Sequence, residues 1–367
     1  MRYSSKFSRV VAVSCSSALV MFGVAACGSS NNNKSSSGGG SGKTEVGVLL
    51  PDTQSSVRWE TQDRPDLAKA FSAAGVKAQI VNAQGDAAQQ RTQAEQAITN
   101  GAKVLLLVDL DPGSGAAIIA NAHKQGVKVI DYDRLTLGGG ADYYVSFDNA
   151  IVGKLQGQGL VSCITAAGTK KPVVAELNGS PDDNNATLFA QGYNSVLDPL
   201  YASGKYVKGP NQSVPKWDNQ KALTIFEQML AKTNNKINAV LAANDGLGNS
   251  VISALKSRKL PAVPVTGQDA TAQGIQHILA GDQCMTVYKP VNQEAAAASA
   301  LAIALAKGQT PSAPQSVDNK GTKTPAVLLA PLSVTKANAA QPVKDGFLKR
   351  SDVCQGAFAS LCTKAGI

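Results

Sequence analysis

VLLLVDLDPGSGAAIIANAHKQGVKVIDYDR, residues 104–134, reads as a buried strand, a helix and a second buried strand, and an aspartate follows each strand. The continuous apolar runs at 104–108 and 127–130 are typical of parallel strands that are covered on both faces. The segment 115–125 has the length and composition of the helix that connects two such strands. This unit therefore predicts a parallel sheet with polar side chains at the carboxyl ends of its strands, where open α/β sheets bind ligands.

The same alternation of apolar strands and amphipathic helices continues along the chain. Strands are expected in a first set at 46–50, 78–81, 104–108, 127–130 and 143–145, and in a second set at 173–177, 206–207, 239–242, 263–266 and 285–288. Helices are expected at 66–74, 87–100, 115–125, 150–164, 186–197, 220–231, 247–257 and 270–279, followed by a helix at 293–307 and a strand at 327–329. The pattern predicts an α/β protein of two doubly wound parallel-sheet lobes joined by a three-segment hinge. The chain is expected to cross near Asp148, Tyr288 and Leu329, which gives an N-terminal lobe of 45–147 plus 289–328 and a C-terminal lobe and tail of 148–288 plus 329–367.

The N-terminus has the features of an export signal. Residues 1–26 contain three basic side chains, a short apolar segment and two alanines, after which comes Cys27. This order is typical of a cleaved secretory signal, and its end resembles that of a bacterial lipoprotein signal, in which Cys27 would carry the lipid. An uncleaved membrane anchor is the alternative. Residues 27–44 are almost entirely Ser, Gly and Asn, which predicts a flexible linker. Both interpretations place the chain outside the cytoplasm, anchored to a membrane at the cell surface or in the periplasm.

Charge and motifs exclude several classes of function. Of the formal charge of +9, three positive charges lie before Cys27, and the rest is spread without a basic block, so a nucleic-acid partner is not expected. No nucleophile elbow or dinucleotide fingerprint occurs, so we expect no enzyme and no cofactor. A glycosidase using the pair Asp131 and Asp133 is the enzymatic alternative. The only histidines, His123 and His277, are isolated and no Cys-x-x-Cys occurs, so no metal site is expected.

Four cysteines remain after the export segment, and an oxidising compartment makes disulfides plausible among them. Three pairings are possible. Cys354 and Cys362 are close in sequence and are expected to staple the tail, which leaves Cys163 with Cys284 as the second pair.

Polar residues follow the expected strands of both lobes, and parallel strands bring them to one edge. They are Asp52, Asp109, Asp131, Tyr132, Asp133, Arg134, Asn178, Ser180, Asn244, Asp245, Gln268 and Asp269. If the two edges face each other, these groups and Lys289 line one cleft, with donors and acceptors suited to a ligand that has many hydroxyls. The two tryptophans, Trp59 and Trp217, lie in polar loops and could sandwich the apolar face of a sugar ring.

Taken singly, each of these residues also has an ordinary structural interpretation. Asp133 and Arg134 could form a surface ion pair, and Asn244 and Asp269 could cap the helices that follow them. Lys289 could be an ordinary loop lysine, and either tryptophan could cover the edge of a core. The functional interpretation rests on their shared position at one edge of the predicted fold.

The chain resembles the periplasmic sugar-binding proteins of ABC importers, which have the type I two-lobe fold, and within them the xylose-binding group. The segments that carry the resemblance are Arg58-Trp59, Tyr132-Asp133-Arg134, Val145 to Asn149, Ser180 to Asn185, Asn244-Asp245, Gly267 to Ala270 and Thr286 to Pro290. It extends from about Val46 to Phe347. The chain departs from the group in its 138–140 glycine loop, in Cys163 and Cys284, and in its lipid anchor and paired tail cysteines.

The resemblance implies a monomer that captures a monosaccharide, with D-xylose expected first, and delivers it to a membrane permease served by an ATPase. A receptor for several sugars or a component of a sugar chemoreceptor is the alternative, and a sugar-responsive transcription regulator would need a DNA-binding segment where this chain has an export signal. The implied ligand contacts are Arg58, Trp59, Asp133, Arg134, Asn185, Trp217, Asn244, Asp269 and Lys289. Asn184 could share or replace the role of Asn185.

Overall fold

The computed structural model describes residues 43–367 of the chain. The expected signal peptide, the lipidation site Cys27 and all but the last two residues of the expected linker lie outside the described residues. Within residues 43–367, none of the helices combines the length and apolar character needed to cross a membrane.

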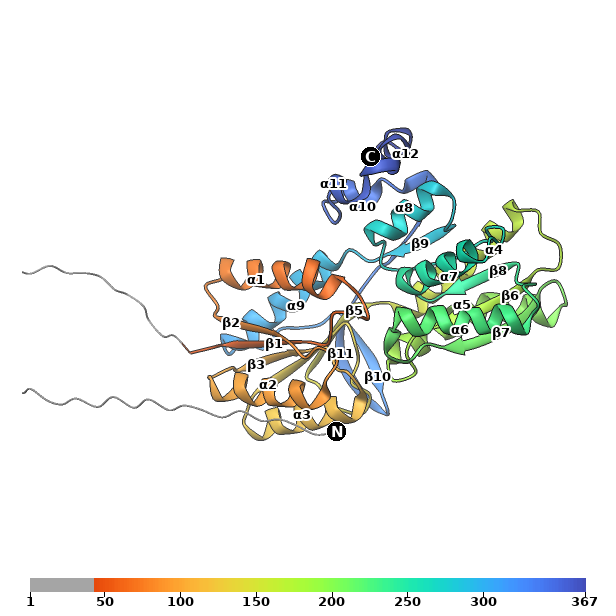
Figure 1. The fold of residues 1–367 in the computed structure, drawn as a ribbon. Coiled ribbons are helices and arrows are strands. Elements are labelled where there is room, and N and C mark those ends of the chain that lie inside the picture. Colours follow the sequence, from red (N-terminus) through yellow and green to blue (C-terminus); the bar gives the residue numbers. More distant parts are fainter. Residues whose placement is uncertain (1–42) are drawn as a thin grey trace, which may run out of the picture. The chain divides into compact units, whose positions relative to one another are not determined.

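The first sheet has seven strands in the order β10-β11-β5-β4-β3-β1-β2, and only β10 runs antiparallel to its neighbour. Its strands are β1 Val46–Leu50, β2 Ala78–Asn82, β3 Val104–Leu107, β4 Lys128–Tyr132, β5 Tyr143–Phe147, β10 Gln315–Asn319 and β11 Thr322–Leu329. Its helices are α1 Arg64–Ala73, α2 Ala87–Thr99, α3 Pro112–Lys124 and α9 Val291–Ala306, and a short π-helix, η1 Trp59–Asp63, leads into α1. We call this sheet, these helices and η1 the N-lobe (Figure 1).

Both faces of the first sheet are covered because successive side chains of its strands point to opposite sides. Leu106 of β3 packs in one cluster with Phe71 of α1 and Ala298 of α9. Its neighbour Leu105 packs in a second cluster with residues of α2 and α3, among them Ile119. The sheet is therefore doubly wound, and the ends of β1, β3 and β4 come to one edge.

The second group of strands is less regular. It consists of the parallel sheet β7-β6-β8 and the antiparallel pair β9-β12, which isolated bridges connect through Val265 and Gln268. Its strands are β6 Val173–Asn178, β7 Val207–Ser213, β8 Ala239–Ala242, β9 Met285–Tyr288 and β12 Leu332–Thr335, and its helices are α4 Asn149–Ala166, α5 Asn184–Ala202, α6 Asn219–Lys232, α7 Asp245–Ser257 and α8 Ala272–Ala280. We call these elements the C-lobe, and they share one large hydrophobic core.

One expected strand forms only in part. Residues 263–266 make a single bridge between Val265 and Val240 instead of a strand. Pro264 has no N–H and cannot donate to a neighbouring strand, which limits the pairing. Its carbonyl still accepts from Val240 N at 2.8 Å, and Thr266 N donates to Val240 O at 3.1 Å.

The strand expected at 327–329 is the end of β11, whereas β10, β12 and the tail helices have no clear counterpart in the apolar pattern. The turn of the hairpin β10-β11 carries Lys320 and Gly321 at φ 53° and 88°. Two successive positive φ values define the type of turn that matches the twist of a two-residue hairpin. The tail helices are α10 Gln341–Lys344, α11 Arg350–Val353 and α12 Ala359–Ala365.

Three segments connect the elements of the two lobes. Phe147 ends β5 and α4 begins at Asn149, β9 ends at Tyr288 before α9, and β11 is followed by β12. Asp148 N donates to Leu329 O at 3.0 Å, so two of these connections lie side by side. Disulfides join Cys163 to Cys284 and Cys354 to Cys362, the two expected pairs.

Candidate functional site

A cavity lies where the strand ends of the N-lobe meet those of the C-lobe, with about 330 Å³ of empty space including the part open to solvent. All the residues expected to contact a ligand line it: Arg58, Trp59, Asp133, Arg134, Asn185, Trp217, Asn244, Asp269 and Lys289. The rest of its lining was not expected as ligand contacts and consists of Ser55, Ser56, Asp183, Phe189 and Gln268. The structure therefore gathers residues from distant parts of the sequence around one polar space.

Arg58 organises the N-lobe side of the cavity. Its Nη1 donates to Asp133 Oδ2 at 2.8 Å, and its Nε and Nη2 each donate to a carboxylate oxygen of Asp63 at 2.8 Å. Nη2 also lies 2.5 Å from Glu294 Oε2 at the start of α9. Burial alone would raise the pKa of Asp133, but Arg58, Lys289 and Arg134 together hold that pKa below its usual value. Asp133 therefore stays an ionised acceptor at neutral pH.

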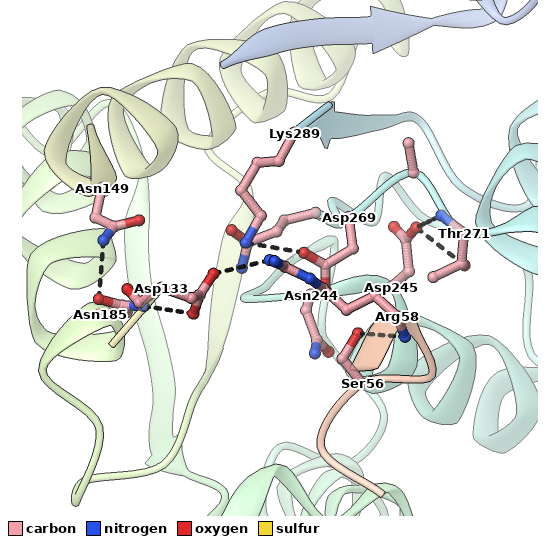
Figure 2. A network of polar contacts seen from close by, with 12 residues as sticks. Ser56, Arg58, Asp133, Asn149, Asn185, Asn244, Asp245, Asp269, Thr271 and Lys289 are labelled. Carbon is pink, nitrogen blue, oxygen red and sulfur yellow. Dashed lines mark hydrogen bonds and ion pairs between the residues drawn. The ribbon is translucent and has the colours of Figure 1, made fainter. Parts of the chain in front are cut away.

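Asn185, near the start of α5, reaches the N-lobe. Its Nδ2 donates to Asp133 O at 3.0 Å and to Asp133 Oδ1 at 3.1 Å, while its Oδ1 accepts from Asn149 Nδ2 at 2.8 Å. Figure 2 shows Asp133 between Asn185 and Arg58. Asn185 lines the cavity, and Asn184 is not among the residues that line it.

Asn244 caps a helix and also reaches the N-lobe. Its Oδ1 caps α7 by accepting from Leu247 N at 2.9 Å, and its Nδ2 lies 3.5 Å from Ser55 O of the N-lobe. Asp269 is not a helix cap, because Thr271 caps α8. Asp269 Oδ1 instead lies 3.0 Å from Lys289 Nζ (Figure 2), and Lys289 is buried beside it, which rules out an ordinary loop lysine.

The two tryptophans line the cavity from different lobes, and both are buried. Trp59 Nε1 donates to Ser55 Oγ at 3.1 Å, and the Arg58 guanidinium carbon lies 4.5 Å from the centre of the Trp59 ring. Trp217 Nε1 donates to Asp183 Oδ2 at 3.1 Å. Each indole also belongs to the hydrophobic core of its lobe. Each tryptophan therefore covers the edge of a core and lines the cavity at the same time.

The Trp217 indole lies directly against the backbone at Gly179. A Cβ placed on Gly179 would come within 2.1 Å of Trp217 Cη2 and Cζ2. Only glycine leaves room for this close approach. The backbone at Trp217 has φ 56°, a left-handed conformation that residues other than glycine rarely adopt. Asp133 at φ 61° and Asp269 at φ 91° also have positive φ values. Backbone strain of this kind gathers at functional sites.

The two aspartates of the glycosidase alternative do not face the cavity together. Asp131 is fully buried, and its two oxygens accept from Thr136 N and Thr136 Oγ1, each at 2.8 Å. Burial raises the pKa of Asp131 well above its usual value. β4 ends at Tyr132, and the positive φ of Asp133 breaks the alternation that would place both carboxylates on one face. Of these two aspartates, Asp133 lines the cavity and Asp131 does not.

Asp133 and Arg134 also do not pair with each other as a surface ion pair. Asp133 pairs with Arg58, and Arg134 Nε lies 3.4 Å from Asp183 Oδ2, with all four side chains buried. Asp183 is the main residue that sequence reasoning missed. It lies inside the segment Ser180 to Asn185 that carried the resemblance, but nothing in the sequence separates it from Asp182.

Charges on the cavity lining balance. The cations are Arg58, Arg134 and Lys289, and the carboxylates are Asp133, Asp183 and Asp269. Across residues 43–367, His, Cys, Asp and Glu side chains form no group of three or more that could hold a metal ion.

A model of the periplasmic binding protein domain matches residues 46–310. The chain belongs to this family. It is 36% identical over 313 residues to the D-xylose-binding periplasmic protein of Escherichia coli, covering 85% of this chain and 93% of the relative. It is 35% identical over 329 residues to a multiple sugar-binding periplasmic receptor of Rhizobium radiobacter, covering 84% of this chain and 92% of the relative.

A solved structure of a carbohydrate transporter solute-binding protein from Chloroflexus aurantiacus, in complex with D-glucose, matches with a TM-score of 0.77 and 31% identity. The match covers 84% of this chain and 97% of that one. These comparisons confirm the type I periplasmic binding protein fold. The three proteins are named for binding or transport, which agrees with the expectation that this chain is not an enzyme.

Proposed function

We propose that this chain is an extracytoplasmic solute-binding lipoprotein that captures a monosaccharide between its two lobes and delivers it to an ABC importer. The observation that carries the proposal is the cavity, in which charged donors, charged acceptors and two indoles from opposite lobes surround one space. Carboxylates accept hydrogen bonds from sugar hydroxyls, and Arg and Lys donate to them. Indole faces supply the apolar contact that polar groups cannot give to the C–H faces of a sugar ring.

The charge balance favours a neutral ligand. Three cations face three carboxylates in the cavity lining, and several of them are already paired, as Lys289 is with Asp269. A ligand with its own charge would leave an uncompensated charge in a buried site, which costs several kcal/mol. A neutral sugar therefore fits this lining better than a sugar acid or an amino sugar.

D-xylose is the first candidate ligand. The support is the 36% identity to the xylose-binding relative over nearly its whole length. The alternative is a receptor for several sugars, such as arabinose, glucose, galactose and ribose, or a component of a sugar chemoreceptor. A multiple sugar-binding relative at 35% identity and a glucose complex at 31% identity favour that alternative. Between D-xylose and the hexoses, the difference turns on whether the closed cavity has room for the extra hydroxymethyl group of a hexopyranose, whereas arabinose and ribose differ from xylose only in the configuration of their hydroxyls.

The proposed mechanism is closure of a lobe of residues 45–147 plus 289–328 onto a lobe of residues 148–288 plus 329–367, about the three connecting segments. Contacts from Asn185 to Asp133 and from Asp183 to Arg134 are of the kind that would form only on closure. The sugar bridges the lobes and so selects the closed form. That form, a monomer held to the membrane by a lipid on Cys27 after removal of the signal peptide, would then dock on a permease served by an ATPase. No cofactor and no nucleic acid take part.

The experiment is isothermal titration of the compact unit Gly42–Ile367 with D-xylose, L-arabinose, D-ribose, D-glucose and D-galactose. One-to-one binding of D-xylose alone supports the xylose assignment. Binding of several sugars supports the multiple-sugar alternative, and no binding of any sugar overturns the proposal.

A variant of Asp269 tests the site itself. Asp269→Asn is the substitution of choice, because asparagine tolerates the positive φ at this position better than alanine does. It removes the charged partner of Lys289, so we expect a loss of sugar affinity of at least about tenfold in a folded protein. Unchanged affinity in a folded Asp269→Asn protein would remove Asp269 from the site.

A further inference from the structure

The turn that carries Asp269 has a strained backbone. Asp269 and the next residue, Ala270, have φ values of 91° and 50°, and neither is a glycine. Left-handed conformations are unfavourable for residues with a side chain and persist only where the surrounding structure fixes them. The place of the Asp269 carboxylate, 3.0 Å from Lys289 Nζ, therefore depends on the groups that hold this turn.

A buried carboxylate behind the cavity holds the turn. Asp245 begins α7, is wholly shielded from solvent and is not among the residues that line the cavity. Its Oδ2 accepts from Thr271 N at 2.7 Å and from Thr271 Oγ1 at 3.1 Å (Figure 2). Its Oδ1 accepts from Thr286 Oγ1 at 2.8 Å, and that hydroxyl oxygen lies 3.3 Å from Ala270 N, which donates to it. Asp245 is thus connected to the backbone N–H groups of both residues that follow Asp269.

The space around this carboxylate fits it closely. A Cβ on Gly267 would lie 2.0 Å from Asp245 Oδ1, and a Cβ on Gly274 would lie 2.2 Å from Asp245 Oδ2. One of these glycines comes just before the turn, and the other lies in α8 just after it. Both leave room for the carboxylate, and the close fit fixes its two oxygens opposite the donors of Thr271 and Thr286.

The contacts of Asp245 require a group that only accepts hydrogen bonds. Gln283 Nε2 donates to Asp245 Oδ1 at 2.8 Å and to Met285 O at 3.1 Å, so this amide cannot turn over without placing its own oxygen against Met285 O. The N–H of Thr271, on the other side, is part of the backbone. An asparagine in place of Asp245 would therefore set its N–H group against a fixed donor on either side, whereas an ionised carboxylate accepts on both oxygens.

The same network reaches the ion-pair partner of Asp269. Thr286 lies on β9, and Lys289 directly follows the end of that strand. The turn is also paired with β9, because Asp269 N donates to Val287 O at 2.8 Å. Asp245 is therefore connected to the backbone on both sides of the Asp269–Lys289 pair that lines the cavity.

An acid in the first turn of a helix is often explained by the helix dipole, which favours negative charge at that end. The side chain of Asp245, however, accepts from groups that lie outside its own helix. Resting on the proposed function, we propose that Asp245 is a positioning residue of the sugar site, which does not contact the sugar and sets the place of the Asp269 carboxylate by holding the left-handed turn through Thr271 and Thr286. Neighbouring residues then have separate roles, with Asn244 lining the cavity and Asp245 supporting it from behind.

The experiment is a double-mutant cycle in the compact unit Gly42–Ile367. Asp245→Asn removes the group that only accepts, and Thr286→Val removes the link to Ala270. Each substitution is made alone and together with Asp269→Asn. A residue that acts through Asp269 loses its effect on affinity when Asp269 has already been changed, whereas an independent effect is the same in both backgrounds.

The matched control is Thr266→Val. Thr266 is a buried threonine of the same lobe, and its hydroxyl donates to Ala242 O and accepts from Ala242 N, each at 3.0 Å, so its bonds do not go to the turn. Burial raises the pKa of Asp245 to about 7, so the titrations are made at pH 8, where wild type carries the carboxylate. The ligand is D-xylose or, if wild type does not bind it, the sugar of the five-member panel that wild type binds most tightly. Urea unfolding measures the stability of every variant.

We expect sugar affinity to fall at least about tenfold in Asp245→Asn and at least about threefold in Thr286→Val. Combined with Asp269→Asn, we expect each of the two to change affinity by no more than about twofold. Thr266→Val should lower the free energy of unfolding but keep affinity within about twofold of wild type. A hydrogen-bond network that supports only the core would lower stability without this pattern in affinity.

The possible failures are distinguishable. If wild type binds no sugar, the proposed function fails and the role of Asp245 with it. If wild type binds sugar but folded Asp245→Asn and Thr286→Val keep its affinity, or lose the same factor with and without Asp269→Asn, the sugar site stands and the positioning role is overturned. If Asp245→Asn does not fold, Thr286→Val decides alone. If Asp269→Asn binds too weakly to titrate, equal affinities of Thr286→Val and the control Thr266→Val overturn the proposal, and a loss confined to Thr286→Val supports it.

Discussion

Arg58 Nη2 lies 2.5 Å from Glu294 Oε2, and the side chain of Glu294 is wholly shielded from solvent. The other oxygen of Glu294, Oε1, has no hydrogen-bond partner among residues 43–367. Burial raises the pKa of Glu294 to about 8, and Asp133 and Asp63 add to the rise, while Arg58 and Lys289 oppose it. The buried cluster around Arg58 therefore holds a proton at neutral pH.

Replacing Glu294 with glutamine tests this protonation through stability. Because the pKa of Glu294 is higher in the folded chain than its ordinary value of 4.5, the folded chain holds the extra proton between these values, and stability falls as pH rises through about 8. We expect wild type to lose about 2 kcal/mol more than Glu294→Gln between pH 6 and pH 8. Urea unfolding at both pH values measures the difference.

The control for this comparison is Glu227→Gln. Glu227 is exposed and lies 3.9 Å from Arg258, so its removal should leave the pH dependence of wild type unchanged. Asp109 and Asp245, whose pKa values burial raises to about 7, are present in all three proteins and cancel in the difference. If wild type and Glu294→Gln lose the same stability between pH 6 and pH 8, Glu294 is not the group that holds the proton.

The neighbours Asn184 and Asn185 give a matched pair for the sugar site. Asn185→Ala removes the two hydrogen bonds to Asp133 and the acceptor for Asn149, so we expect sugar affinity to fall about ten- to a hundredfold. Asn184→Ala removes a side chain outside the cavity and should leave affinity within about twofold of wild type. Titration with the sugar that wild type binds measures both, and equal effects of the two substitutions would contradict the placement of Asn185.

Gly179→Ala tests whether sugar binding depends on the position of the Trp217 indole. The added Cβ meets the rigid ring at 2.1 Å, so either the indole or the backbone at residue 179 must move. We expect at least about a tenfold loss of sugar affinity and a shifted tryptophan emission, with the fold retained, because overpacking of this kind costs about 1–3 kcal/mol. Gly113→Ala is the control, since its Cβ would meet only the carboxylate of Asp111 at 3.2 Å. Wild-type affinity in Gly179→Ala would show that the indole position is not critical.

Hydrophobic pattern explains why most of the fold was predictable from the sequence. Buried strands such as β3 and β8 are continuous apolar runs, and polar residues follow them, Asp109 after β3 and Asn244 after β8, of which Asn244 lines the cavity. Because parallel strands bring their ends to one edge, the order of apolar runs predicted a polar edge in each lobe, and the family resemblance implied that Asp133, Asn244 and Asp269 contact one ligand between them. The strands β10 and β12 escaped prediction because they lie outside this apolar pattern, with β10 largely polar and exposed.

What the sequence did not reveal is the direction in which side chains point. Asp131 and Asp133 are two residues apart, and only the positive φ of Asp133 sends their carboxylates to different partners. In the same way, Asp183 becomes important because Arg134 reaches it from the other lobe. Contacts of this kind depend on backbone turns and on the closure of two lobes, and neither leaves a local pattern.

The two disulfides are expected to contribute unequally to stability. Cys163–Cys284 closes a loop with a sequence separation of 121, whereas Cys354–Cys362 closes one with a separation of 8. A crosslink restricts the unfolded chain more when its loop is longer, so the chain-entropy model gives roughly 5 kcal/mol for the first bond and roughly 2.5 kcal/mol for the second. We therefore expect Cys163→Ala/Cys284→Ala to lower the free energy of unfolding by about twice as much as Cys354→Ala/Cys362→Ala. Urea unfolding of the two double variants at one pH measures both values. A larger loss of unfolding free energy in the tail variant would contradict the chain-entropy model. It would mean that the short crosslink also supports contacts of the folded tail, such as the packing of Phe347 against Tyr288, whose ring centres lie 5.1 Å apart.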